Sequence, residues 1–147
     1  MPRTNRSEFP DGMFHITTRG VDGVRAFRDD VDRAFFLKLL GANARRSDWH
    51  VEAFCLMGTH YHLVLSSVVA RLAAGMHRLN GDYARAFNRR HDRRGHLWAA
   101  RYSSWIIEGD EYLENTVRYV LLNPVRAGLC ERPEEWRWSG SRSGLPA

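Results

Sequence analysis

Two histidines stand two positions apart in the segment HYHLVLS, as His60 and His62. The alternation of this segment predicts a strand, and alternate residues of a strand point to the same face about 7 Å apart. Two imidazoles at that spacing can bind one divalent metal ion. Because the chain holds seven histidines among its 147 residues, such a pair also arises by chance. An ordinary polar sheet face is therefore the alternative interpretation.

A tyrosine and an asparagine near the other end of the chain form a second candidate. Tyr112, Thr116, Tyr119 and Asn123 recur at helical spacing, which predicts a polar stripe along one helix. Tyr119 and Asn123 lie one turn apart, so that a hydroxyl and a carboxamide can face a neighbouring site together. The alternative is that Tyr119 is a boundary residue with a solvated hydroxyl and that Asn123 only marks the end of the helix.

Positive charge is concentrated in one segment. The chain has 22 Lys and Arg against 17 Asp and Glu, a formal net charge of +5, and its pI is near 9.8. Six arginines fall between residues 85 and 101, where the one acid is Asp92. This pattern favours an anionic partner such as nucleic acid, and a solvated loop is the alternative.

The candidate DNA contacts combine this segment with Arg19 and with the arginines at seven-residue spacing along the helix before it. One tryptophan joins them, because an indole can stack on an unpaired base, although it can equally anchor a core. The residues are Arg19, Arg71, Arg78, Arg85, Arg89, Arg90, Arg93, Arg94, Trp98 and Arg101.

The elements that must position these residues follow from hydrophobic periodicity and turn signals. In chain order we predict a strand over 13–20, a helix over 30–47, strands over 51–57 and 60–66 with a turn at Gly58-Thr59 between them, a helix over 72–87, a strand over 102–107, and a helix from Asp110 to near Asn123, where Pro124 stops it.

This order predicts an α+β fold: a ferredoxin-like antiparallel sheet with two helices covering one face and the other face left for function. No repeat or composition shift divides the chain, so we predict one domain over residues 1–147 with its core at about 13–140. No apolar run reaches the roughly 18 residues of a membrane span, and no signal segment is present. Cys55 and Cys130 are too few for a disulfide framework. We therefore expect a cytoplasmic protein that does not contact membranes.

Four segments together resemble a known family. MFHITTRG, FCLMGTHYHLVLS, GHLWAARYSS and RYVLLNPVRAGL, in this order and at these separations, are similar to the single-tyrosine HUH transposases of small bacterial insertion sequences, and above all to their REP-associated relatives. The resemblance covers about residues 13 to 140. Gly58-Thr59 stands where the family usually has Pro-Asn, and Ala99 stands where it commonly has Gln. Neither difference affects a residue of the two candidate pairs.

The resemblance implies a ferredoxin-like fold of the HUH endonuclease type, which cuts and rejoins single-stranded DNA, often beside a hairpin, through a 5′-phosphotyrosine intermediate. It implies that Tyr119 is the nucleophile and that His60, His62 and Asn123 hold a divalent metal ion. We expect Mg²⁺ in the cell and tighter binding of Mn²⁺, because two imidazoles favour Mn²⁺ more than an all-oxygen site does. The expected partner is single-stranded or hairpin DNA, and the protein is expected to be a monomer or a homodimer.

Two other functions remain open at this point. One is a domesticated module that binds hairpin DNA without cutting it. The other is an RNA-binding domain with a structural zinc ion, which is disfavoured because only two histidines cluster and the cysteines lie apart in the sequence.

Overall fold

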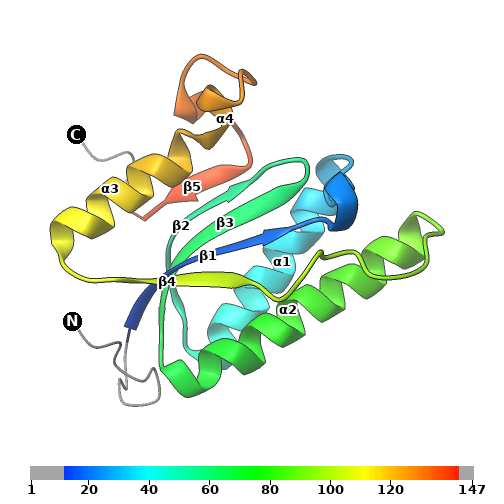
Figure 1. Cartoon of the computed structure of the whole chain (residues 1–147), viewed down its shortest axis with the longest axis horizontal. Helices are drawn as coiled ribbons and strands as arrows, with labels where there is room; N and C mark the ends of the chain where they lie inside the picture. Colours follow the sequence, from blue (N-terminus) through cyan, green and yellow to red (C-terminus); the bar gives the residue numbers. More distant parts are fainter. Residues whose placement is uncertain (1–11, 143–147) are drawn as a thin grey trace.

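A five-stranded sheet crosses the centre of the protein (Figure 1). The structure is a computed structural model that describes residues 12–142. Every pair of neighbouring strands is antiparallel, and the strand order is β4-β1-β3-β2-β5. The strands are β1 (Gly12–Arg19), β2 (His50–Leu56), β3 (His60–Ser67), β4 (Ser103–Ile107) and β5 (Ser139–Ser141). The β-α-β-β-α-β order of the first four strands confirms the predicted α+β, ferredoxin-like fold.

Two long helices, α1 (Asp30–Ser47) and α2 (Val69–Arg90), cover one face of the sheet (Figure 1). α1 begins where the periodicity predicts, because the side chain of Asp29 accepts a hydrogen bond from the Asp32 backbone N–H and so caps the first turn. The apolar side of α2 carries Leu72, Met76, Leu79, Tyr83 and Phe87, all buried in the core beneath the sheet.

The opposite face carries a third helix, α3 (Asp110–Leu121), which packs on β2 and β3. α3 thus lies on the face that was predicted to be left for function, and it covers part of that face. Val117, Val120 and Leu121 on α3 are buried against Val64 and Cys55 of the sheet. Burial of this apolar stripe fixes α3 to the sheet, and with it the residues on the polar side of the helix.

Alternation along β1 and β3 sends different side chains to the two faces. Phe14 and Ile16 of β1 enter the core under α1 and α2, whereas His15 and Thr17 face the side of α3. Thr17 lies directly opposite His62 in the antiparallel register. The polar residues of β1 and β3 thus meet on the sheet face that α3 only partly covers.

The chain after α3 differs from the prediction. α3 ends at Leu121, and a further helical turn, α4 (Asn123–Arg126), carries Pro124 in its first turn. Proline is tolerated there because the first N–H groups of a helix have no intrahelical partner. β5 was not predicted, since its three small polar residues have no apolar alternation; it pairs with β2 at the edge of the sheet.

Two 3-10 turns, Val21–Gly23 and Pro133–Glu135, complete the secondary structure of this region. Across residues 12–142, none of the helices combines the length and the apolar character needed to cross a bilayer.

Candidate active site

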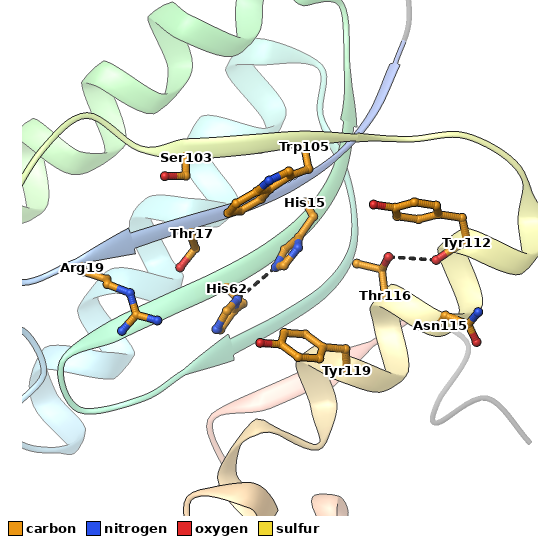
Figure 2. Close-up of a pocket in the computed structure, with 10 residues that line it drawn as sticks. All are labelled: His15, Thr17, Arg19, His62, Ser103, Trp105, Tyr112, Asn115, Thr116 and Tyr119. Carbon is orange, nitrogen blue, oxygen red and sulfur yellow. Dashed lines mark hydrogen bonds between the residues drawn. The ribbon is translucent and has the colours of Figure 1, made fainter. Parts of the chain in front are cut away.

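A cavity of about 630 Å³ opens on the sheet face beside α3. Ten residues from β1, β3, β4 and α3 line it, so its walls come from segments far apart in the sequence (Figure 2). Among them are His62 and Tyr119, two of the residues predicted to carry the chemistry.

Tyr119 lies beside the histidine pair. The ring centres of Tyr119 and His62 are 6.1 Å apart, and those of His60 and His62 are 5.2 Å apart. Figure 2 shows the phenol of Tyr119 extending from α3 with its hydroxyl towards His62. The side chain is 51% exposed, so the hydroxyl is accessible to a large substrate. One chain therefore brings the tyrosine and both histidines together.

Arg126 of α4 holds Tyr119 from the other side. Its guanidinium carbon lies 4.1 Å from the centre of the Tyr119 ring, and its Nη2 donates a hydrogen bond of 2.5 Å to the Tyr119 carbonyl oxygen. This places a permanent positive charge beside the phenol. Arg126 was not among the predicted site residues, because only the fold of α4 back towards α3 brings it here.

His15 is a third histidine of the site that was not predicted. Its Nε2 lies 3.0 Å from Nδ1 of His62, and the two rings stack at 5.2 Å with an interplanar angle of 24°. The bond occupies Nδ1 of His62 and leaves Nε2 for another partner. The alternation of MFHITTRG places His15 on the correct face, but its pairing with His62 depends on the register between β1 and β3.

Burial keeps the three imidazoles neutral. Desolvation lowers the pKa of His60 to about 4, with a smaller contribution from the Arg19 charge. Desolvation lowers the pKa of His62 to about 3, and the neighbouring His15, His60, Arg19 and Arg126 act in the same direction. Burial also lowers the pKa of His15. Neutral imidazoles carry the free lone pair that a metal ligand requires.

Asn123 is half-buried at the start of α4, one turn after Tyr119, and it is not part of the cavity lining. Its side-chain Nδ2 is buried without a hydrogen-bond partner. A buried polar atom without a partner is unusual in a folded protein. A flip of the carboxamide would place its oxygen at the same position. No cluster of three or more His, Cys, Asp or Glu residues suited to a metal ion exists in the described part of the chain. The imidazoles of His60 and His62 are the potential metal ligands that ring contacts place beside Tyr119.

The arginines at seven-residue spacing on α2 do not share one environment. Arg71 lies 4.0 Å from the carboxylate of Asp48, Arg78 donates a 3.2 Å hydrogen bond to Asn43, and Arg85 pairs with Asp82 within α2. Arg71 and Arg78 thus approach the C-terminal part of α1. Arg71 and Arg85 are exposed, and solvated pairs of this kind contribute little to stability.

The other arginines among the candidate DNA contacts fall into two groups. Arg90 binds Asp29 and Asp32 of the α1 N-terminus at 2.7 Å, and Arg93 donates hydrogen bonds to Asn88 and to backbone carbonyls of its own loop. Within residues 12–142, no side-chain hydrogen bond or ion pair engages the exposed arginines of the second group. They are Arg19, Arg89, Arg94 and Arg101.

Trp98 is held mainly by the core. Its Nε1 donates a 3.1 Å hydrogen bond to the Asn80 carbonyl, and its ring packs 5.6 Å from Tyr61 and 5.8 Å from Tyr83. The part that stays accessible lines a groove of about 1030 Å³ between α2 and the loop before β4. Arg85 and Arg101 line the same groove.

Comparisons with known proteins agree with this architecture. A family model described as IS200-like transposase matches residues 10–123. The structure of a REP-associated tyrosine transposase bound to a REP hairpin superimposes with a TM-score of 0.78 at 14% identity, over 95% of this chain and 82% of that one. The crystal structure of a "putative transposase" from Deinococcus radiodurans R1 gives a TM-score of 0.53 at 17% identity, over 82% of this chain and 96% of that one. The chain matches none of the curated protein sequences with which it was compared.

Proposed function

The chain belongs to the family of IS200-like transposases, and from this premise we propose that it cuts and rejoins single-stranded DNA through a covalent tyrosine intermediate. The observation that carries the proposal is the approach of Tyr119 to the His60 and His62 pair within one chain, with 6.1 Å between the rings of Tyr119 and His62. No second subunit is needed to bring the tyrosine to the histidines.

Tyr119 acts as the nucleophile in this proposal. Its hydroxyl oxygen attacks the scissile phosphorus, the phenolic proton is released, and the bond to the 3′ oxygen of the upstream nucleotide breaks. The products are a 5′-phosphotyrosine ester and a strand ending in a 3′-OH. One phosphate ester replaces another, so that a 3′-OH can reverse the reaction without ATP. The positive charge of Arg126 beside the ring stabilises the negative charge that the reacting oxygens carry.

The donor set next to Tyr119 fits a divalent cation. His60 and His62 are neutral, and the Asn123 carboxamide is buried with an unsatisfied polar atom. We assign these three residues as the ones that would hold Mg²⁺ or Mn²⁺. The ion, when bound, supplies positive charge to the oxygens of the scissile phosphate.

His15 acts as a positioning residue for His62. Metal-binding histidines commonly use their second ring nitrogen in a hydrogen bond that fixes the tautomer and the ring orientation. The bond between His15 Nε2 and His62 Nδ1 has this form, and it leaves Nε2 of His62 as the nitrogen that would bind the ion.

The proposed substrate is single-stranded DNA next to a hairpin. The family and the solved REP-associated transposase that is bound to a REP hairpin support this substrate. The exposed side chains of Arg89, Arg94 and Arg101 supply positive charge for it. Because the proposed substrate is DNA, we also propose that the protein acts in the cytoplasm.

Adduct formation tests the proposal. Labelled single strands tiled across the DNA on both sides of the coding gene are incubated with the protein and Mn²⁺, and then separated on a denaturing gel. We expect one strand to yield a protein–DNA adduct that EDTA prevents and that His62→Ala abolishes. His50→Ala is the matched control, because His50 is an exposed histidine at the start of β2 and is not among the residues that line the cavity. Strand binding without any adduct in the parent protein would favour the non-cutting hairpin-binding module instead.

A further inference from the structure

Exposed aromatic side chains gather around the cavity that contains Tyr119. Trp105 is 48% exposed, Tyr112 50% and Tyr119 51%. These are three of the six large apolar residues that residues 12–142 leave exposed, and all three line this one cavity. Large exposed apolar surface is unfavourable in water, and its concentration at one place marks a binding surface.

Trp105 and Tyr112 approach the site from two different elements. Trp105 comes from β4, the edge strand of the sheet, and its ring centre lies 5.2 Å from that of His15. Tyr112 lies two helical turns before Tyr119 on the same side of α3, roughly 10 Å away along the axis. That distance corresponds to about three stacked nucleotides at about 3.4 Å each. Figure 2 shows both rings projecting from opposite walls of the cavity.

The charge of the cavity suits a nucleic acid strand. No carboxylate is among the residues that line it, and Arg19 stands at the end near His62. The acidic Asp110 and Glu111 are in the first turn of α3, beyond Tyr112 and outside the lining. A strand with its phosphate at Arg19 and Tyr119 therefore meets aromatic surface, and not negative charge, in the cavity itself.

We propose that Trp105 and Tyr112 form a stacking site for unpaired bases of the DNA strand next to the scissile phosphate. The inference rests on the proposed function, because it places the scissile phosphate at Tyr119. Aromatic rings bind any unpaired base through its face, and those faces are hidden within a duplex. The site would therefore bind single-stranded DNA at the cleavage position, in addition to any contact that DNA makes with Trp98 in the groove.

Binding to strands that lack single bases tests this site without depending on cleavage. Tyr119→Phe protein, which keeps the ring but cannot form the ester, is titrated with a fluorescent hairpin bearing a single-stranded tail taken from the adduct-forming strand. Each tail position is replaced in turn by an abasic nucleotide. We expect one or two positions at which base loss weakens binding by about tenfold, which is typical of one stacked base.

The second arm changes the protein. In the Tyr119→Phe background, Trp105→Ala is expected to weaken binding of the intact tail by about tenfold and to remove the effect of the abasic nucleotide at one position. Tyr112→Ala is expected to do the same at a neighbouring position, whereas Trp105→Phe retains most of the affinity. Phe35→Ala is the matched control, since Phe35 is 38% exposed on α1 and outside this cavity.

Two results would overturn the stacking site. One is that Trp105→Ala and Tyr112→Ala bind the intact tail as the parent does. The other is that each variant still responds to every abasic position as the parent does. With either result, adduct formation by the protein with Tyr119 intact would still support the proposed function. A parent protein that neither binds the strand nor forms an adduct would overturn the stacking site and the proposed function together.

Discussion

His15 Nε2 lies 3.0 Å from Nδ1 of His62, and the two rings are stacked between β1 and β3. The contact joins a residue of the first strand to one of the three predicted metal ligands. Because burial keeps both imidazoles neutral, one ring nitrogen can donate and the other accept. His62 is thereby held in one orientation before any metal or DNA binds.

Loss of this contact is expected to weaken metal binding. His15→Ala should lower the affinity for Mn²⁺ by about 10- to 100-fold, which is the usual effect of removing the partner of a ligating histidine. His15→Gln should restore part of the affinity, because its amide can still bond Nδ1 of His62. Calorimetric titration of Mn²⁺ in the presence of single-stranded DNA measures both, with His50→Ala as the control. Equal affinities in His15→Ala and the parent would remove His15 from the site.

The role of Asn123 as a metal ligand can be tested separately from its effect on folding. Asn123→Ala removes a buried polar group that has no hydrogen-bond partner, so the Tm of the metal-free protein should stay the same or rise. A ligand that binds only the folded protein raises Tm, and the parent should show this increase with Mn²⁺. In Asn123→Ala the increase should be much smaller. An undiminished Mn²⁺-dependent increase in Tm would show that Asn123 is not a ligand.

The exposed arginines should determine how binding depends on salt. Each phosphate of a single strand that a protein neutralises contributes about −0.7 to the slope of log K against log salt concentration. Replacement of Arg89, Arg94 and Arg101 by Gln should therefore flatten the slope by up to about 2, the sum of three such contributions. Arg93→Gln is the comparison variant, because its guanidinium is engaged within its own loop. A slope that is unchanged in the triple variant would mean that this loop is merely solvated.

Arg90 has a structural role with a defined pH dependence. Its hydrogen bonds hold the pKa of Asp29 well below the usual value of an aspartate. A carboxylate with a lowered pKa stabilises the folded state above its unfolded pKa of about 4, and this contribution is lost as the pH falls through the folded pKa. Arg90→Gln should thus lower Tm at pH 7, and the difference from the parent should shrink as the pH is lowered below about 4. Thermal unfolding followed by circular dichroism measures the difference, and a constant difference from pH 7 to pH 2 would contradict this assignment.

The fold was largely predictable because strong periodicities coincide with real elements. The predicted helix over 30–47 matches α1, and each of the four predicted strands is present within a few residues of its predicted bounds. Glycine is normally unfavourable inside a helix, but a Cβ at Gly75 of α2 would lie 2.3 Å from the Trp49 ring. That requirement comes from a residue outside the helix, and no pattern along α2 reveals it.

Candidate site residues could be named from the sequence only where the members of a pair lie close together along the chain. His60 and His62 share a strand, and Tyr119 and Asn123 lie one turn apart along the chain, so that local spacing finds each pair. The contributions of His15 and Arg126 depend on strand register and on the turn after α3. Likewise, the choice between Trp98 and Trp105 depends on which indole the core buries.

Cleavage of one strand labelled at either end tests the central assignment most directly. The parent protein and Tyr119→Phe are incubated with Mn²⁺ and the same single strand, labelled at its 5′ or its 3′ end. Tyr112→Phe serves as the control, because Tyr112 lies on the same side of α3 and also keeps its ring. The account predicts that the parent and Tyr112→Phe retain the 3′-labelled fragment through its 5′ phosphate and release the other fragment with a 3′-OH, while Tyr119→Phe forms no adduct. An adduct that persists in Tyr119→Phe, or one that retains the 5′-labelled fragment, would contradict it.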